Sequence, residues 1–365
     1  MKSISIKVVA VLGALALSLG AQAGNPDRVG QAGATELLIN SFARSSGWGA
    51  VHSAGITGLE ATQLNIAGIA YTPRTEVVFA RTNWLVPSGV HVSTFGFAQK
   101  LKNEAALSLS INNLSFGEIQ RTTTDHPEGG IGTFSPQFLN VGIGYAKRFS
   151  NSISGGIQMK IINEAIEDVR ASGVALDAGV QYKTSSQKKG IKKDDIKFGI
   201  SIRNVGPDMK FSGDGLSIKA RINGNNSYDN TVENRVATFN LPSQVNIGAS
   251  YDIRLDKDSN TYFHRLTAAG NFVSNSFSRN NLVLGLEYAY KEFLMLRTGF
   301  VYEKDIFKQL AVDGRQTALT GFCGGLTFEL PLNKKTGTTL GFDYSYRSTN
   351  PFRGIHSFGI RLNLQ

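Results

Sequence analysis

From about residue 75 to the end of the chain, apolar and polar residues alternate in segments separated by turn-forming residues. The last segment is the clearest, with one face made by His356, Phe358, Ile360, Leu362 and Leu364 and the other by Ser357, Gly359, Arg361, Asn363 and Gln365. A period of two predicts a β-strand with two different faces. A strand of this kind that runs to the final residue is typical of a barrel that closes on itself in a membrane.

The same alternation recurs upstream and gives about 14 predicted strands in all. The upstream strands are expected at 76–85, 90–101, 106–116, 139–149, 152–162, 174–183, 196–205, 244–253, 263–273, 281–290, 293–302, 320–330 and 338–346. A soluble sandwich or propeller is the alternative, but aromatic residues recur at strand ends and no blade-length repeat is visible. We therefore predict an all-β fold, a transmembrane antiparallel β-barrel of about 14 strands that spans residues 71–365.

The connections between the predicted strands differ in length. Four are long and polar: 117–136, 184–195, 206–242 and 303–315. Short turns alternating with long loops are typical of periplasmic turns and extracellular loops, although 184–195 and 206–242 are consecutive in this count. Because binding residues are often placed on loops, the predicted partner-binding residues are Asn223, Asn225, Asn226, Tyr228, Asp125 and His126.

The N-terminal part of the chain has a different pattern. Residues 1–23 are predicted to be a signal peptide, with basic Lys2 and Lys7, an apolar stretch too short to span a bilayer, and small residues at the cleavage site. Residues 24–70 are rich in glycine and lack sustained alternation, with one helix-compatible stretch at 34–44. We interpret 24–70 as a short segment that enters the barrel lumen as a plug. Four of its residues are expected either to pack against the wall or to line an apolar pocket: Leu37, Leu38, Ile39 and Phe42.

The charge of the chain changes the expected partners. The formal net charge is +10, and loss of Lys2 and Lys7 with the signal peptide leaves +8 on the mature chain. Export makes nucleic acid an unlikely target for this excess, so outer-membrane lipid or lipopolysaccharide is the expected partner. Charges inside strands are expected to face the lumen, because a charge at the lipid midplane costs about 2–4 kcal/mol. These are Asp177, Arg203, Glu287, Arg297 and Asp343.

A search for chemistry is mostly negative. The five histidines are scattered without the spacing of a metal site, and the single cysteine, Cys323, has no pattern around it that indicates a nucleophile. No phosphate-binding loop or nucleophile elbow is present, and the glycine pairs lie inside alternating strands. We therefore expect no enzyme activity, no cofactor and no metal.

Two stretches carry a resemblance to a known family. The PorV/PorQ family has an Asn-Pro-Ala-Gly-Leu segment, which resembles Leu64-Asn65-Ile66-Ala67-Gly68-Ile69-Ala70 in this chain. The first strand of that family resembles the predicted strand Thr75 to Leu85, which ends in Trp84-Leu85. The PorV/PorQ family is itself related to the FadL-like 14-stranded transporters. The start Val29 to Ala34 is similar to the Gly/Ala-rich start of that family. The family-motif positions are thus Asn65, Ala67, Gly68 and Trp84. Ile66 replaces the usual proline, and the acidic stretch commonly found between the two motifs is absent.

The resemblance implies an outer-membrane component of type IX secretion, a system of Bacteroidota linked to gliding motility. PorV-like proteins dock beside a very large translocon barrel, bind the C-terminal signal domains of secreted cargo proteins and carry the cargo to the cell surface. FadL-like relatives instead take a hydrophobic small molecule into the lumen and release it laterally. The expected function is therefore PorV-like docking and cargo shuttling. The alternatives are FadL-like transport and a purely structural accessory barrel of a secretion or gliding complex.

Overall fold

The computed structural model describes residues 28–184, 187–188, 191–192, 196–222, 228–256, 263–311, 314–333 and 336–365. The predicted signal peptide at 1–23 lies outside these residues. In the part of the chain that is described, no helix is long and apolar enough to cross a membrane.

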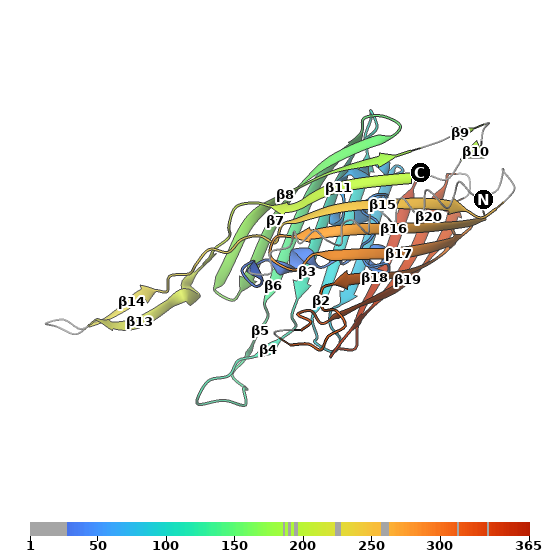
Figure 1. Ribbon diagram of the computed structural model, residues 1–365. Helices are drawn as coiled ribbons and strands as arrows, with labels where there is room; N and C mark the ends of the chain where they lie inside the picture. The colour runs from blue at the N-terminus through green and yellow to red at the C-terminus, as the bar shows by residue number, and fades with distance from the viewer. Residues whose placement is uncertain are drawn as a thin grey trace.

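Fourteen long strands form a closed antiparallel barrel (Figure 1). They are β1 (Thr75–Asn83), β2 (His91–Lys100), β3 (Ala105–Ser115), β6 (Gln137–Arg148), β7 (Ile153–Ile166), β8 (Val169–Lys183), β11 (Ile196–Val205), β15 (Gln244–Arg254), β16 (His264–Asn275), β17 (Asn281–Tyr290), β18 (Leu294–Glu303), β19 (Leu319–Asn333), β20 (Thr338–Thr349) and β21 (Ile355–Leu364). Each pairs with its neighbours in the chain, and the pairing of β1 with β21 closes the wall. The predicted all-β, 14-strand barrel is confirmed.

The two faces of each strand differ in polarity as the alternation requires. In β21 the side chains of Ser357 and Arg361 are buried, whereas those of Phe358 and Ile360 are about half exposed. The outer wall is therefore apolar and the inner wall polar, the reverse of a soluble barrel. The five strand charges predicted to face the lumen are all buried inside the barrel, which confirms their placement.

The connections fall at two ends of the barrel, because neighbouring strands are antiparallel. We call the end that holds the start of β1 and the end of β21 the terminal end, and the opposite end the loop end. Three of the four predicted long connections lie at the loop end, whereas 184–195 joins β8 to β11 at the terminal end. This long connection at the terminal end explains why 184–195 and 206–242 follow one another without a short turn between them.

Short strands extend the connections beyond the wall. Figure 1 shows two projections at the loop end, one made by β13 (Ser217–Ile222) and β14 (Tyr228–Glu233) and the other by β4 (Ile119–Gln120) and β5 (Thr133–Phe134). The remaining short elements are β9 (Gln187–Lys188), β10 (Ile191–Lys192), β12 (Phe211–Ser212) and the 3₁₀ turn η6 (Asp214–Leu216). β12 pairs with the loop end of β8 and so joins the first projection to the wall.

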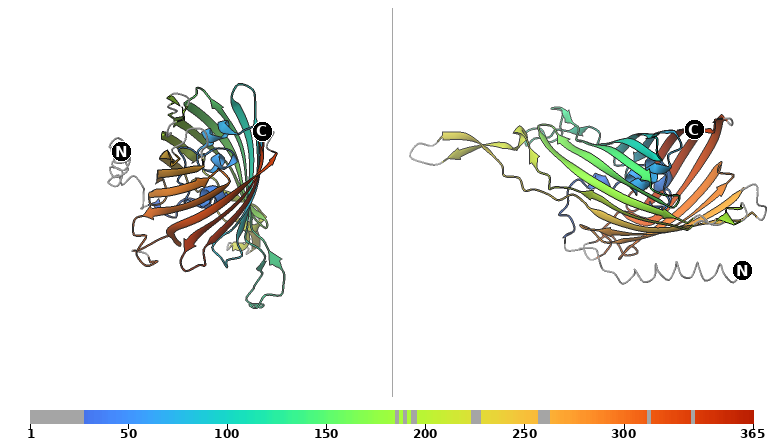
Figure 2. Two further views of the ribbon diagram at one scale, coloured as in Figure 1. Left: turned by 90° about the vertical axis from the view of Figure 1, so that its right-hand side faces the viewer. Right: turned by 90° about the horizontal axis from the view of Figure 1, so that it is seen from above.

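Residues 28–74, which we call the inner segment, run through the lumen (Figure 2). The inner segment begins at the loop end, where Gly33 N–H donates to the Asn240 carbonyl, and ends where β1 starts at the terminal end. Its helices are η3 (Thr35–Leu38), α2 (Ala43–Ser46), η4 (Leu59–Gln63) and η5 (Ile66–Tyr71). The helix-compatible stretch at 34–44 is thus not one helix, because extended residues separate η3 from α2.

Glycines on the inner wall let this segment lie directly on the strands. A Cβ atom at Gly199 would come within 2.5 Å of the Ser53 carbonyl oxygen, and one at Gly299 within 2.5 Å of the Trp48 carbonyl oxygen. Side chains at these positions would push the inner segment away from the wall. These strand glycines therefore serve close backbone approach.

Candidate functional site

Asn65 is the central anchor of the inner segment. Its side-chain oxygen accepts from Ala67 N–H and caps η5. Its amide nitrogen donates to the carbonyls of Ser53 at 3.0 Å and of Val180 at 3.1 Å, the latter on β8. One side chain thus ties two turns of the inner segment to the barrel wall, and Gly179 leaves room for it.

A second anchor lies on the other side of the lumen. The Thr94 hydroxyl on β2 donates to the Ser41 hydroxyl at 2.6 Å, and the Ser41 hydroxyl donates to the side-chain oxygen of Asn112 on β3 at 3.1 Å. Thr82 on β1 donates to the Ser41 carbonyl. The inner segment is therefore held by hydrogen bonds at Ser41 as well as at Asn65.

Ion pairs reinforce the wall around these anchors. Asp177 on β8 accepts from Lys160 on β7 at 2.6 Å and from the backbone N–H of Asn204 at 2.8 Å. Arg203 donates to Gln63 in the inner segment at 3.4 Å, which joins this cluster to η4. Buried charges of this kind persist only when they are paired.

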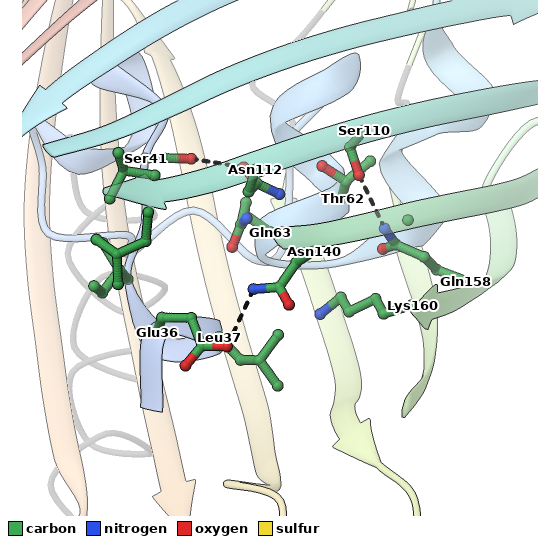
Figure 3. Close-up of a pocket in the computed structure, with 14 residues that line it drawn as sticks. Glu36, Leu37, Ser41, Thr62, Gln63, Ser110, Asn112, Asn140, Gln158 and Lys160 are labelled. Carbon is green, nitrogen blue, oxygen red and sulfur yellow. Dashed lines mark hydrogen bonds between the residues drawn. The ribbon is translucent and has the colours of Figure 1, made fainter. Parts of the chain in front are cut away.

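A narrow cavity remains between the inner segment and strands β2, β3, β6 and β7 (Figure 3). It is lined by Glu36, Leu37, Ile39, Ser41, Thr62, Gln63, Val92, Ser110, Asn112, Leu114, Asn140, Gly142, Gln158 and Lys160. Of about 470 Å³ of free space, only about 20 Å³ is wide enough for the centre of a water molecule. The cavity as it stands is too narrow for an aromatic hydrocarbon.

The chemistry of the cavity is polar. Asn140 donates to the Glu36 carboxylate at 3.3 Å, and burial raises the pKa of that carboxyl above its usual range. The side-chain oxygens of Asn140 and Gln158 are buried without a partner, so they can accept hydrogen bonds from water or a polar ligand. No group of three or more metal-ligating His, Cys, Asp or Glu side chains occurs among the described residues.

The four predicted plug residues do not form one apolar pocket. Leu37 and Ile39 line the cavity, but Leu38 is 37% exposed and Phe42 packs in a separate cluster against Val78 on β1 and its neighbours. A 3₁₀ turn followed by extended backbone sends successive side chains in different directions. Leu37 and Phe42 thus pack against the wall at different places, and the four residues do not line one common apolar pocket.

The family-motif positions have distinct structural roles. Ala67 is fully buried, and a Cβ at Gly68 would come within 2.1 Å of the Ile56 carbonyl oxygen, so only glycine fits there. Trp84 follows β1 at the loop end, where its backbone N–H donates to the Val90 carbonyl. The first three positions thus organise the inner segment, whereas Trp84 closes the turn between β1 and β2.

The three predicted loop residues that the structure describes lie on two separate projections. Asp125 and His126 are exposed between β4 and β5, and Tyr228 begins β14 opposite Ile222. Asn223, Asn225 and Asn226 fall outside the described residues. In Figure 1 the two projections extend from different parts of the rim.

Sequence reasoning missed the polar lining of the cavity. Ser110, Asn140 and Gln158 occupy inward positions of predicted strands, so the alternation placed them in the lumen without marking them as a site. Their gathering depends on the path of the inner segment, because Glu36 meets Asn140 across 104 positions of the chain. The only available signal was a run of polar residues on the inward face of neighbouring strands.

No family model and no curated protein matches this chain. Solved structures with a similar fold include the toluene transporter TodX of Pseudomonas putida, at 10% identity, with 89% of this chain and 97% of that chain covered and a TM-score of 0.52. The deltaS2 mutant of the TodX monoaromatic hydrocarbon channel gives 10% identity, 89% and 97% coverage and a TM-score of 0.50. A FadL homologue of Pseudomonas aeruginosa, at 10% identity with 89% and 97% coverage, gives a TM-score of 0.44. The likeness to TodX shows a shared barrel fold.

Proposed function

We propose that this chain is an outer-membrane transporter of small hydrophobic molecules whose inner segment closes the lumen. The observation that carries the proposal is the continuous 14-strand wall with an N-terminal segment threaded through it from end to end. The fold similarity to a toluene transporter supports this alternative better than it supports type IX secretion. The apolar outer wall supports membrane insertion.

Transport through this lumen requires the inner segment to move. The cavity beside it is narrow and most of its lining residues carry polar side chains, so it does not suit a hydrocarbon in the described state. The hydrogen bonds at Ser41 hold the inner segment to β2 and β3, the strands that line the cavity. Release of this anchor would widen the space between the inner segment and the wall.

The test is a reversible lock on that anchor. The hydroxyl oxygens of Ser41 and Thr94 are 2.6 Å apart, so Ser41→Cys with Thr94→Cys is expected to form a disulfide, in a Cys323→Ala background without other thiols. The readout is uptake of labelled toluene by host cells that lack such a transporter. Uptake is expected to stop on oxidation and to return on reduction.

A matched control locks the wall at the rim instead. The hydroxyls of Ser243 and Ser276 are 2.8 Å apart and exposed, so the corresponding cysteine pair joins two rim segments and leaves the inner segment free. This pair is expected to leave uptake unchanged when oxidised. Uptake that persists with the Ser41–Thr94 lock fully oxidised would contradict the proposal.

A second candidate is the PorV-like role in type IX secretion, favoured by the projection made by β13 and β14. This hairpin is paired only within itself, and its residue Ile218 is 46% exposed. A two-stranded hairpin is marginal alone in water, so a docking partner would stabilise it. The partners implied by the family resemblance are a large translocon barrel and cargo proteins with C-terminal signal domains.

The second candidate is tested by recovery of partners from native outer membranes. An affinity tag in the loop at 304–318 leaves both projections intact, and a comparison variant replaces 213–236 with a short turn. We expect a very large barrel and secreted proteins to be recovered with the full chain and to be lost with the shortened variant. Recovery of neither with the full chain would argue against this role.

A further inference from the structure

Arg81 is a charge on the outer wall. It lies on β1 at a position that alternates with the buried Ala80 and Thr82, so its side chain points away from the lumen and is exposed. Its cross-strand neighbours are Phe358 on β21 and Ser93 on β2. The arginine therefore stands in a wall whose other outward residues at this place are largely apolar.

Unlike Arg297 and Arg361 inside the barrel, Arg81 has no side-chain partner among the described residues. The guanidinium of Arg297 pairs with Glu287 at 2.5 Å, and that of Arg361 pairs with Glu329 at 2.7 Å. The Arg81 guanidinium makes no hydrogen bond or ion pair with any residue in the described ranges. A guanidinium beside apolar side chains in a lipid-facing wall is costly unless an anion compensates it.

A groove lies beside Arg81 on the same outer wall. The groove spans β19, β20, β21 and β1, holds about 820 Å³ of free space and is open on the outer side. The apolar residues that line it are Phe79, Leu326, Phe328, Phe342, Tyr344, Phe358 and Ile360. The groove thus offers an apolar, mostly aromatic surface that ends at a single fixed cation.

We infer that this groove binds one phosphate-bearing lipid, with the phosphate on Arg81 and an acyl chain along the aromatic residues. Arginine recognises phosphate through two parallel hydrogen bonds, and the groove matches an acyl chain in polarity. Arg81 is two residues from the loop end of β1, where a headgroup would meet the membrane surface. Charge complementarity favours an anionic lipid over a zwitterionic one.

The test compares two lipids of equal acyl chains on the full chain in a non-ionic detergent. Native mass spectrometry counts bound phosphatidylglycerol and phosphatidylcholine as each is titrated. The unaltered protein is expected to retain phosphatidylglycerol about tenfold more tightly, the difference that one charge-assisted hydrogen-bond pair supplies. Arg81→Gln is expected to remove that preference, and Arg81→Lys to keep part of it, because lysine retains the charge without the paired geometry.

Arg170 provides the matched control. It is an exposed, outward-facing arginine near the loop end of β8, far around the wall from β1, and it does not line the groove. Arg170→Gln is expected to leave the lipid preference unchanged. An equal loss with Arg170→Gln would mean diffuse attraction to a basic protein and would overturn the specific site.

Two further arms separate the lipid from other occupants. Inorganic phosphate is expected to leave phosphatidylglycerol bound, because the acyl chain holds it; complete displacement by phosphate would overturn the lipid proposal. A photo-crosslinking residue in place of Phe79 in native membranes is expected to give an adduct of lipid mass. A protein adduct there would identify the groove as a protein interface instead. All variants are first checked for the heat-dependent mobility shift of a folded barrel.

Discussion

Buried charges in this barrel are stabilised by partners on neighbouring strands. Glu287 on β17 lies between Arg297 at 2.5 Å and Arg265 at 2.9 Å. Its alternation predicted that it faces the lumen, and the short turn between β17 and β18 sets the register that brings Arg297 opposite it. A residue-level prediction from the sequence succeeds here because the contact is local.

Removal of the Glu287 charge is expected to destabilise the barrel strongly. Glu287→Gln keeps the shape but leaves the buried guanidinium of Arg297 without its carboxylate and removes one of the two carboxylates that pair with Arg265, at a cost of about 3–5 kcal/mol. The measurement is the free energy of unfolding by urea from lipid vesicles. Glu292→Gln is the control, because Glu292 also pairs with Arg265 but is exposed at the rim, so its loss costs about 0–1 kcal/mol. Equal costs for the two variants would contradict the buried network.

Gly179 shows a residue whose role the sequence could not reveal. A Cβ there would come within 2.1 Å of the Asn65 side-chain oxygen, across more than a hundred residues of chain. The alternation marked Gly179 as inward but gave no information on what approaches it. Long-range contacts with the inner segment are set by a path that has no periodic signal.

Gly179→Ala is therefore expected to displace Asn65 and loosen the inner segment. The displaced amide would leave the Ser53 and Val180 carbonyls with a weaker donor, at about 1–3 kcal/mol for buried groups. Protease cleavage within the inner segment, followed by mass spectrometry, is the measurement. Gly324→Ala is the control, because its added Cβ would meet only the Arg297 carbonyl oxygen at 3.8 Å. If the inner segment resists protease cleavage equally in the two variants, the close contact between Gly179 and Asn65 is not needed to hold it.

At the scale of elements, strands were predicted far better than the inner segment. All fourteen wall strands occur where alternation placed them, and β17 has the expected bounds. β7 and β8 extend further at the loop end, because their turn projects beyond the region where one face must be apolar. The sequence predicts a loop where β13 and β14 form a hairpin, because their polar composition gives no alternation with a buried face. The helix-compatible stretch at 34–44 is interrupted because the Asn40 side chain accepts from Phe42 N–H and stabilises an extended residue there.

The first turn of the inner segment is expected to respond to pH through Glu36. Burial raises the pKa of this carboxyl, so the folded state binds its proton more tightly than the unfolded state does. Its contribution to stability is therefore complete below the ordinary carboxyl pKa of about 4.5 and is lost as the pH rises through the folded value. The inner segment should become easier to cleave by protease as the pH rises above about 4.5.

Glu36→Gln isolates this effect from other pH-dependent changes. The amide imitates the protonated carboxyl, so protease cleavage of the variant near η3 is expected to depend little on pH. Glu128→Gln is a suitable control, because Glu128 is exposed in the loop between β4 and β5. A pH dependence that is the same in Glu36→Gln and in the unaltered chain would assign the response to another group.

At the scale of the whole molecule, the apolar character of the outer wall is the property that a two-residue period predicts best. Outward positions such as Ile200, Leu286 and Phe358 are about half exposed, and they surround a lumen lined by buried polar groups. The cavity and its plug could not be predicted in the same way, because their geometry depends on how one irregular segment packs inside a finished wall. Fold therefore follows from pattern, whereas the candidate site follows from tertiary contacts.

A charge placed on this wall tests whether hydrocarbon surrounds it. Ile200 lies midway along β11 and is 54% exposed, so Ile200→Arg is expected to cost about 2–4 kcal/mol in lipid vesicles. Tyr182 lies at the terminal end of β8 and is 42% exposed, so Tyr182→Arg should cost only about 0–1 kcal/mol. Unfolding by urea from vesicles measures both. A large cost at Ile200 alone would locate the hydrocarbon core around the middle of the strands. An arginine exposed to water costs little at either position, so similar small costs for both variants would mean that the barrel wall faces water.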